Sequence, residues 1–148
     1  LFTEIRDKLG LAYSVYSYVD HFLDSGSLTI YAGVETKNLR AAIKAILEQL
    51  ARLREPIPEA ELAKAKELSK GHLVLRMEDS RNVAAWLGGQ EVLTGRIIDV
   101  DQVVAIIDAI TADELKQLDQ ELLVGQKPCL AILGPVASDE PLEELLQI

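Results

Sequence analysis

Cysteine, histidine and aromatic residues are scarce in this chain of 148 residues. A single cysteine, Cys129, rules out an intramolecular disulfide and a zinc site built on paired thiolates. Its two histidines, His21 and His72, lie far apart in the sequence, so no His-x-x-x-His ligand pair is present. We interpret Cys129 as a core residue and both histidines as surface or packing residues.

Positive charge and long apolar runs are also lacking. The chain has 15 Lys and Arg against 24 Asp and Glu, a net charge of -9, and its basic residues are scattered. Nucleic acid is therefore excluded as an expected partner. No apolar run approaches the roughly 20 residues that span a bilayer, and no signal-peptide pattern is present. The low cysteine content suits the cytoplasm without excluding an envelope location, so the cellular location is left open.

The first 34 residues change from a helical pattern to a strand pattern. Residues 1–9 place apolar side chains at helical spacing, and Gly10 is expected to end that helix. Residues 11–19 are rich in β-branched and aromatic side chains, as strands are. A turn near Ser25-Gly26 separates them from residues 28–34, which alternate in the same way. This pattern predicts a β-hairpin.

Helical patterns dominate the middle of the chain. Thr36 is expected to cap a helix whose apolar stripe runs from Leu39 to Leu53. Pro58 suits the first position of a second helix, which continues to about Met77. A third helix is predicted over about 81–93.

The last third of the chain carries two capping-box pairs and one apolar run. The pairs Asp99/Gln102 and Thr111/Glu114 predict the starts of two short helices. Residues 128–135, with the sequence PCLAILGP, predict a buried strand.

Strands and helices are segregated along the chain, which predicts an α+β fold with an antiparallel sheet packed against several helices. Three strands make a thin sheet for so many helices. We therefore expect further strands before Leu1 and interpret the chain as part of a longer polypeptide. The acidic tail, residues 137–148, is expected to fray or to dock as one turn.

Arg6 and Tyr13 are the best candidates for chemistry. Arg6 lies on the first predicted helix, and Tyr13 follows seven residues later, just past Gly10. The ordinary alternative is a solvated arginine and a strand tyrosine. The functional hypothesis is that the helix end and the strand start bring a guanidinium and a phenol to one face. Such a pair supplies fixed donors for a carbonyl or an oxyanion, as acyl transfer requires.

Other polar features carry weaker signals. The Gly88-Gly89 pair lacks the strand-then-helix context of a phosphate-binding loop. Five carboxylates are interpreted as solvated charge, namely Glu78, Asp79, Glu140, Glu143 and Glu144. Spacing alone indicates no nucleophile–base pair.

The opening segment LFTEIRDKLGLAYSVYSY closely resembles the start of the C-terminal domain in the pitrilysin and insulin-degrading zinc peptidases, the inverzincins with a His-x-x-Glu-His motif. Within this family it is most similar to the processing-peptidase-like branch. The order of the later elements matches the family as far as Pro135. The most specific local feature is the spacing from Arg6 to Tyr13 together with Gly-Leu-Ala-Tyr.

This resemblance implies an N-terminally truncated peptidase C-terminal domain over residues 1–136, followed by the tail at 137–148. Such domains form half of a clam-shell whose N-terminal half holds zinc on two histidines and a glutamate. The motif glutamate is the general base of these enzymes. By motif match, Arg6 would hydrogen-bond a substrate backbone carbonyl, and Tyr13 would donate its O–H to the oxyanion.

The chain departs from the family pattern because it contains no His-x-x-Glu-His. The segments after His21 and His72 lack both the glutamate and the second histidine. We therefore expect this chain to be inactive alone, with zinc bound by an N-terminal domain or by a homologous partner subunit and with a peptide as substrate. The alternative is a catalytically retired member that serves as a structural or peptide-binding subunit. A generic α+β interaction module would need the element order to match by chance.

One further expectation concerns self-association. A sheet that lacks its neighbouring strands leaves an edge or an apolar face uncovered, which would allow the chain to form a homo-oligomer.

Overall fold

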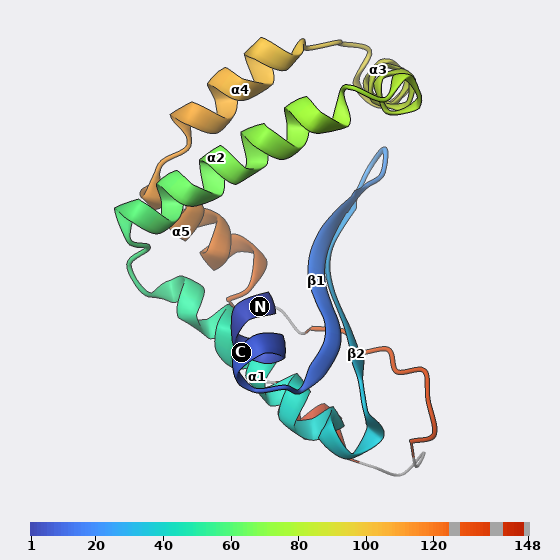
Figure 1. The fold of residues 1–148 in the computed structure, drawn as a ribbon, viewed down its shortest axis with the longest axis vertical. Helices are drawn as coiled ribbons and strands as arrows, with labels where there is room; N and C mark the ends of the chain where they lie inside the picture. Colours follow the sequence, from blue (N-terminus) through green and yellow to red (C-terminus); the bar gives the residue numbers. More distant parts are fainter. Residues whose placement is uncertain (125–127, 137–140, 147–148) are drawn as a thin grey trace. The chain divides into compact units, whose positions relative to one another are not determined.

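The computed structural model describes residues 1–124, 128–136 and 141–146. The chain divides into two compact units, Leu1–Glu55 with Leu118–Ile148 and, separately, Pro56–Gln117. Along the chain (Figure 1) the elements are η1 (Phe2–Lys8), β1 (Ala12–His21), β2 (Gly26–Val34), η2 (Thr36–Asn38), α1 (Leu39–Ala51), η3 (Arg52–Arg54), α2 (Glu59–Arg76), α3 (Ser80–Thr94), α4 (Val100–Ala109), α5 (Ala112–Leu122) and η4 (Glu143–Leu145). The predicted α+β class is confirmed.

β1 and β2 form the predicted antiparallel hairpin. Pairing runs from Ala12 opposite Val34 to His21 opposite Gly26, so the turn lies where the sequence placed it. The register shifts by one residue at the base of the hairpin, where Ala12 faces Val34 but Ser14 faces Gly33. Tyr13 is therefore the extra residue of a β-bulge.

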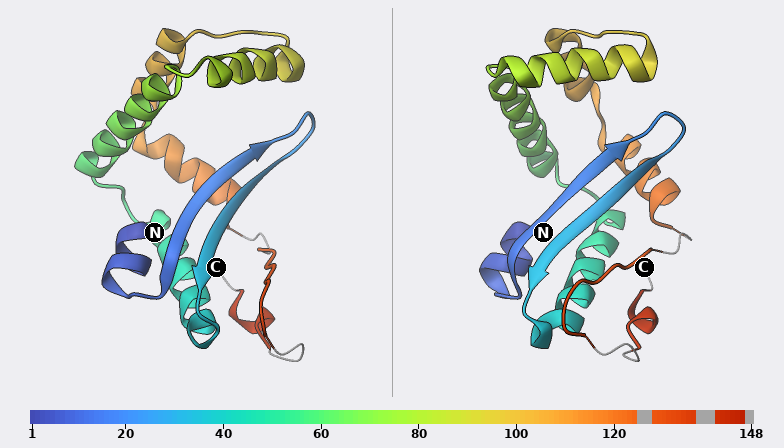
Figure 2. Two further views of the ribbon diagram at one scale, coloured as in Figure 1. Left: turned by 45° about the vertical axis from the view of Figure 1, so that its right-hand side comes forward. Right: turned by 90° about the vertical axis from the view of Figure 1, so that its right-hand side faces the viewer.

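The base of the hairpin packs on the first helix and on α1. Ile5, Ala12, Val15 and Ala45 form one buried cluster, and Ile5 is 0% exposed. Figure 2 shows η1 and α1 beside the base of the hairpin, while its tip extends away from both. The core of this unit therefore fixes the hairpin at the end that carries Tyr13.

The first helix is of the π type. The Leu9 N–H donates to the Glu4 carbonyl oxygen, five residues back, over 3.0 Å. Gly10 follows with a φ of +60°, the left-handed conformation that favours glycine. The expected end of the helix at Gly10 is confirmed.

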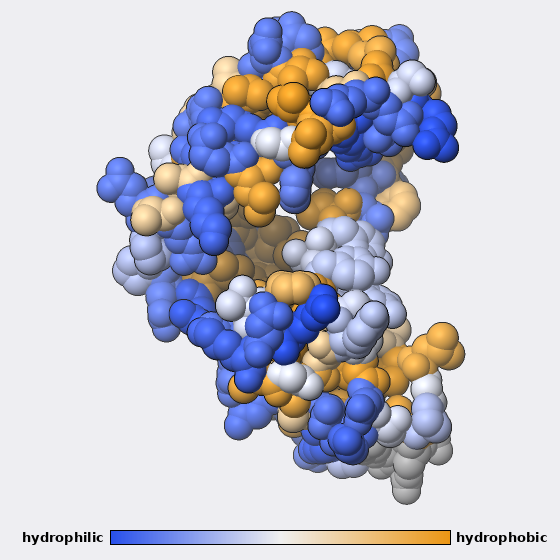
Figure 3. Space-filling model, in the orientation of Figure 1, coloured by the Kyte–Doolittle hydropathy of each residue, from blue (hydrophilic) through white to orange (hydrophobic). Residues whose placement is uncertain are grey.

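The unit Pro56–Gln117 consists of helices held partly by ion pairs. Lys70 Nζ lies 2.6 Å from Glu67 Oε1 and 2.7 Å from Asp108 Oδ1, which joins α2 to α4. Throughout this unit, all of which the structure describes, no residue is fully buried. Large apolar side chains reach its surface (Figure 3), among them Leu68, Val74, Leu75, Leu87, Val92, Leu93, Ile97 and Ile106.

Both predicted capping boxes are present. The Asp99 carboxylate accepts from the Gln102 N–H over 2.8 Å, and the Gln102 side chain accepts from the Asp99 N–H over 3.0 Å. At the start of α5 the Thr111 hydroxyl accepts from the Glu114 N–H over 3.2 Å, and Glu114 Oε2 accepts from the Thr111 N–H over 2.7 Å. The third helix, predicted over about 81–93, spans Ser80–Thr94.

Two predicted helix starts are wrong by a few residues. Thr36 does not cap α1, because it begins the short helix η2 and α1 starts at Leu39. Pro58 precedes α2 instead of opening it, since its ψ of 137° is extended and the helix begins at Glu59. The helix ends at Arg76, next to the predicted end at Met77.

The prediction of a buried strand at 128–135 is wrong. Within residues 128–136 the structure has no strand, and the sheet of the described residues consists of β1 and β2 alone. Cys129 is exposed, which corrects its placement in the core. The physical reason is that no strand pairs with this segment, so its apolar side chains have no sheet to bury them.

The tail docks through Leu142, and Leu145 and Leu146 pack against the same cluster. Leu142 is buried against Leu39 and Ile43 of α1, and the Pro141 carbonyl oxygen accepts from Arg40 Nη1 over 3.5 Å. The expected single turn is η4. Glu140 lies outside the described residues, and the domain boundary at residue 136 remains a prediction.

Candidate functional site

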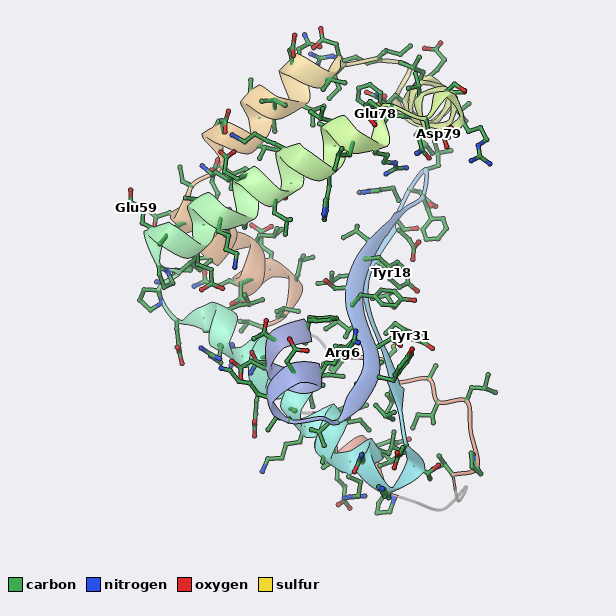
Figure 4. The ribbon with its side chains drawn as sticks, in the orientation of Figure 1. Arg6, Tyr18, Tyr31, Glu59, Glu78 and Asp79 are labelled. Atoms are coloured by element: carbon green, nitrogen blue, oxygen red, sulfur yellow. The ribbon has the colours of Figure 1, made fainter. Side chains whose placement is uncertain are left out.

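Arg6 and Tyr13 lie together, which is the arrangement that the functional hypothesis requires. The Arg6 Cζ atom is 5.7 Å from the centroid of the Tyr13 ring and 4.7 Å from that of the Phe2 ring. Both distances fall within the range of cation–π contacts. Figure 4 shows Arg6 on η1, beside the hairpin.

Buried neighbours hold both residues in place. Ile5, next to Arg6, and Ala12, next to Tyr13, belong to the same buried cluster. The Tyr13 side chain is nevertheless 85% exposed. The backbone at each position is thus anchored in the core while the two functional groups face outward.

The β-bulge determines where Tyr13 points. Bulges bend a strand and re-aim a side chain, and they are frequent next to active sites. Without the extra residue, every side chain from Tyr13 to the turn would fall on the opposite face of the hairpin. The bulge cannot be inferred from alternation alone, so no feature of the sequence indicates it.

A hollow of about 560 Å³ adjoins Tyr13. Its polar lining comes from Tyr13, Ser14, Tyr31, Glu35 and Asn38, and the backbone of Gly10 and Gly33 forms part of its wall. The Lys37 ammonium lies 2.6 Å from the Glu35 carboxylate, and its hydrogen bond lowers the pKa of Glu35. The hollow can therefore accept a polar group beside the phenol.

Nearby lysines are engaged with carboxylates, whereas Arg6 is not. Lys8 donates to Glu4 over 2.5 Å, and this hydrogen bond lowers the pKa of Glu4. Among the described residues, Arg6 contacts two aromatic rings and takes part in no ion pair. Its guanidinium N–H groups are thus available to a carbonyl oxygen from outside the chain.

The described residues do not fit a zinc ion. His21 ends β1 and His72 lies on α2, and both are exposed. Over residues 1–124, 128–136 and 141–146 there is no group of three His, Cys, Asp or Glu side chains that could hold a metal. Asp119 on α5 is buried, but it is not part of such a group.

The other features noted in the sequence have structural roles. Gly88-Gly89 lies inside α3, where no phosphate loop is formed. Asp79, labelled with Glu78 in Figure 4, caps α3 by accepting from the Arg81 N–H over 2.8 Å. Hydrogen bonds from Arg81 lower the pKa of Asp79, so this carboxylate is more than solvated charge. None of the helices among the described residues could span a lipid bilayer.

Sequence reasoning missed two aromatic features. Phe2 stacks on Arg6, and its spacing of four residues from Arg6 could have indicated this contact. The Tyr16 and Tyr31 rings stack across the hairpin with centroids 5.0 Å apart, and Tyr18 lies 6.1 Å from Tyr16. Alternation places Tyr16 and Tyr18 on one face of β1, but only the register brings Tyr31 beside them.

The chain therefore has an exposed guanidinium–phenol pair on an α+β fold, and its described residues form no group that could hold a metal. Residues 1–69 match the family described as "Peptidase M16 inactive domain". The resemblance to the C-terminal domain of this zinc peptidase family is thus confirmed.

Relatives that match most or all of the chain are named as zinc proteases or as a processing peptidase. An uncharacterized zinc protease of Mycobacterium leprae is 37% identical over 100% of this chain and 33% of its own length. A zinc protease of Bacillus subtilis is 35% identical over 91% of this chain and 33% of its own. The mitochondrial-processing peptidase subunit beta of Rattus norvegicus is 27% identical over 85% and 26%, respectively. The chain therefore spans about a third of the length of these relatives.

Solved structures share the fold. A chain in "Complex III2 from Candida albicans, Inz-5 bound" aligns with a TM-score of 0.74 and 25% identity, covering 81% of this chain and 29% of that one. A conserved protein from Enterococcus faecalis aligns with a TM-score of 0.65 and 23% identity, covering 81% and 28%.

Proposed function

We propose that this chain is the non-zinc-binding domain of a zinc metalloendopeptidase and that it supplies Arg6 and Tyr13 to a zinc site on another domain or subunit. The observation that carries the proposal is the Arg6–Tyr13 contact at 5.7 Å, in which two anchored residues expose their donor groups. The zinc protease names of the relatives support the reaction class.

Tyr13 acts on the scissile carbonyl. Its phenolic O–H donates a hydrogen bond to the oxygen on which negative charge develops as the tetrahedral intermediate forms. Because that charge is absent from the bound substrate, the hydrogen bond strengthens mainly in the transition state and raises kcat more than it lowers KM.

Arg6 holds the substrate backbone. Its planar guanidinium lies against Phe2 and Tyr13, which leaves N–H groups at the edge of the plane to donate to a peptide carbonyl oxygen. That contact exists before and during the reaction, so it contributes to positioning of the peptide.

The test is Tyr13→Phe in the full-length protein or complex that contains this chain. Because the ring and its stacking are kept, only the O–H donor is lost. Loss of one oxyanion donor lowers kcat by about a hundredfold to a thousandfold, with KM and zinc content unchanged. Peptide cleavage under saturating substrate measures kcat.

Ser17→Ala is the matched control, because it removes an exposed hydroxyl from the same strand, away from the hollow. It should keep the wild-type kcat. A Tyr13→Phe enzyme that turns over as fast as the wild type contradicts the role of Tyr13.

A further inference from the structure

The outward face of the hairpin is rich in tyrosine and hydroxyl groups. The residues that alternate away from the buried cluster are Ser14, Tyr16, Tyr18 and Asp20 on β1, opposite Gly33, Tyr31, Thr29 and Ser27 on β2. We call these eight residues the tyrosine face. Figure 4 shows Tyr18 and Tyr31 on the right of the hairpin, and Figure 3 shows a pale area of intermediate hydropathy there.

The three rings form one connected surface. Tyr16 stacks on Tyr31 with an interplanar angle of 25°, and it contacts Tyr18 at 39°. Between 44% and 51% of each of these residues is exposed. Tyr31 also lines the hollow beside Tyr13, so the tyrosine face continues from the proposed site.

The charge of this face has one sign. The eight positions include no lysine or arginine, and the single ionisable group besides the tyrosines is the Asp20 carboxylate. Asp20 accepts from the Ser27 hydroxyl over 3.1 Å, which holds the carboxylate at the edge of the face near the turn. The opposite face of the hairpin is mostly apolar, with Val15, Val19, Leu28 and Ile30, and its polar members on β1 are Ser17 and His21.

We infer that the tyrosine face binds an arginine or lysine side chain of an extended peptide. Ring faces attract cations, and the Asp20 carboxylate at the end of the row of rings adds an electrostatic attraction for a cation bound along it. An anionic side chain would find no cation on this face, and an aliphatic one would find hydroxyl groups rather than an apolar surface. The inference rests on the proposed function only in that the ligand is a peptide.

The test measures binding rather than cleavage. The full-length protein or complex is treated with a chelator so that no peptide is cut, and fluorescence anisotropy gives Kd for labelled peptides that differ at one position. The wild type should bind the arginine peptide more tightly than the alanine peptide by about two-fold to five-fold, as for an exposed cation–π contact. A glutamate peptide should bind less tightly than either.

Ring and charge variants then locate the preference. Tyr16→Leu combined with Tyr31→Leu should bring the ratio of the two Kd values close to unity, whereas the corresponding Phe variants, which keep the rings, should retain it. Asp20→Lys should abolish the preference without removing a ring. Circular dichroism shows whether the Leu variants fold. If they do not, Asp20→Lys still tests the inference, because it changes no packed ring.

Matched controls lie outside the face. Phe22→Leu removes an exposed ring next to the turn, and Asp24→Asn removes a carboxylate of the turn. Both should keep the wild-type ratio. Equal Kd values for arginine and alanine peptides in the wild type, or an unchanged ratio in Asp20→Lys, would overturn the inference. Because no step requires turnover, these results are independent of whether Tyr13→Phe lowers kcat.

Discussion

Gly10 connects the two candidate residues, since the chain leaves η1 there and enters β1 two residues later. Its φ of +60° lies in the left-handed region, where a side chain is strained whatever the space around it. No atom lies within 4 Å of the position a Cβ would occupy, so the requirement for glycine is conformational and not steric.

At this scale, replacing glycine by alanine should change the free energy of unfolding in opposite directions at two positions. Gly10→Ala should lower the free energy of unfolding by about 1 kcal/mol because of left-handed strain. Gly71→Ala should raise it by about 0.8 kcal/mol, because Gly71 lies inside α2 with open space around it and alanine is the better helix former. Urea unfolding of both variants measures the difference, and equal shifts would contradict the account.

Among the elements, α5 is one whose first turn is held by a titratable side chain, Glu114. The Thr111 N–H and O–H both donate to Glu114, and these hydrogen bonds hold the pKa of Glu114 below its ordinary value of 4.5. Because the folded pKa is the lower one, the stabilisation is present above pH 4.5 and is lost as the pH falls through the folded pKa.

We therefore expect acid to weaken the first turn of α5. In Glu114→Gln the amide oxygen still accepts the hydrogen bonds but does not titrate, so this part of the acid-induced loss should disappear. Circular-dichroism ellipticity at low pH measures this loss of helix. Glu91→Gln on α3 is the control and should keep the wild-type dependence of ellipticity on pH. Identical acid profiles for wild type and Glu114→Gln would refute the role of the cap.

Local features were predictable and tertiary ones were not. The hairpin, the two capping boxes and Gly10 follow from short-range chemistry, because the residues that decide them are neighbours in the chain. The hypothesis that Arg6 and Tyr13 form a pair rested on the helix end at Gly10 and on the family resemblance, and the structure brings the two side chains into contact. The stacking of Tyr16 on Tyr31 needs the strand register, and the failure of 128–135 to form a strand depends on partners far away in sequence.

At the scale of the whole molecule, the chain spans about a third of the length of its relatives. The unit Pro56–Gln117, described throughout, has no fully buried residue and exposes many large apolar side chains. These features agree with a domain that packs against further protein. The proposal requires such packing, because it places the hydrogen-bond donors on this domain and the zinc on another.

The claim that donors and zinc lie on different domains is tested most directly by the zinc content of the full-length protein or complex that contains this chain, measured after extensive dialysis. The account predicts that zinc stays with the assembly and that Tyr13→Phe contains as much zinc as the wild type, since the described residues of this chain include no group that could hold a metal. An assembly without zinc would contradict the account and favour a retired structural or peptide-binding subunit. Loss of zinc in Tyr13→Phe would contradict the separation of donors from metal.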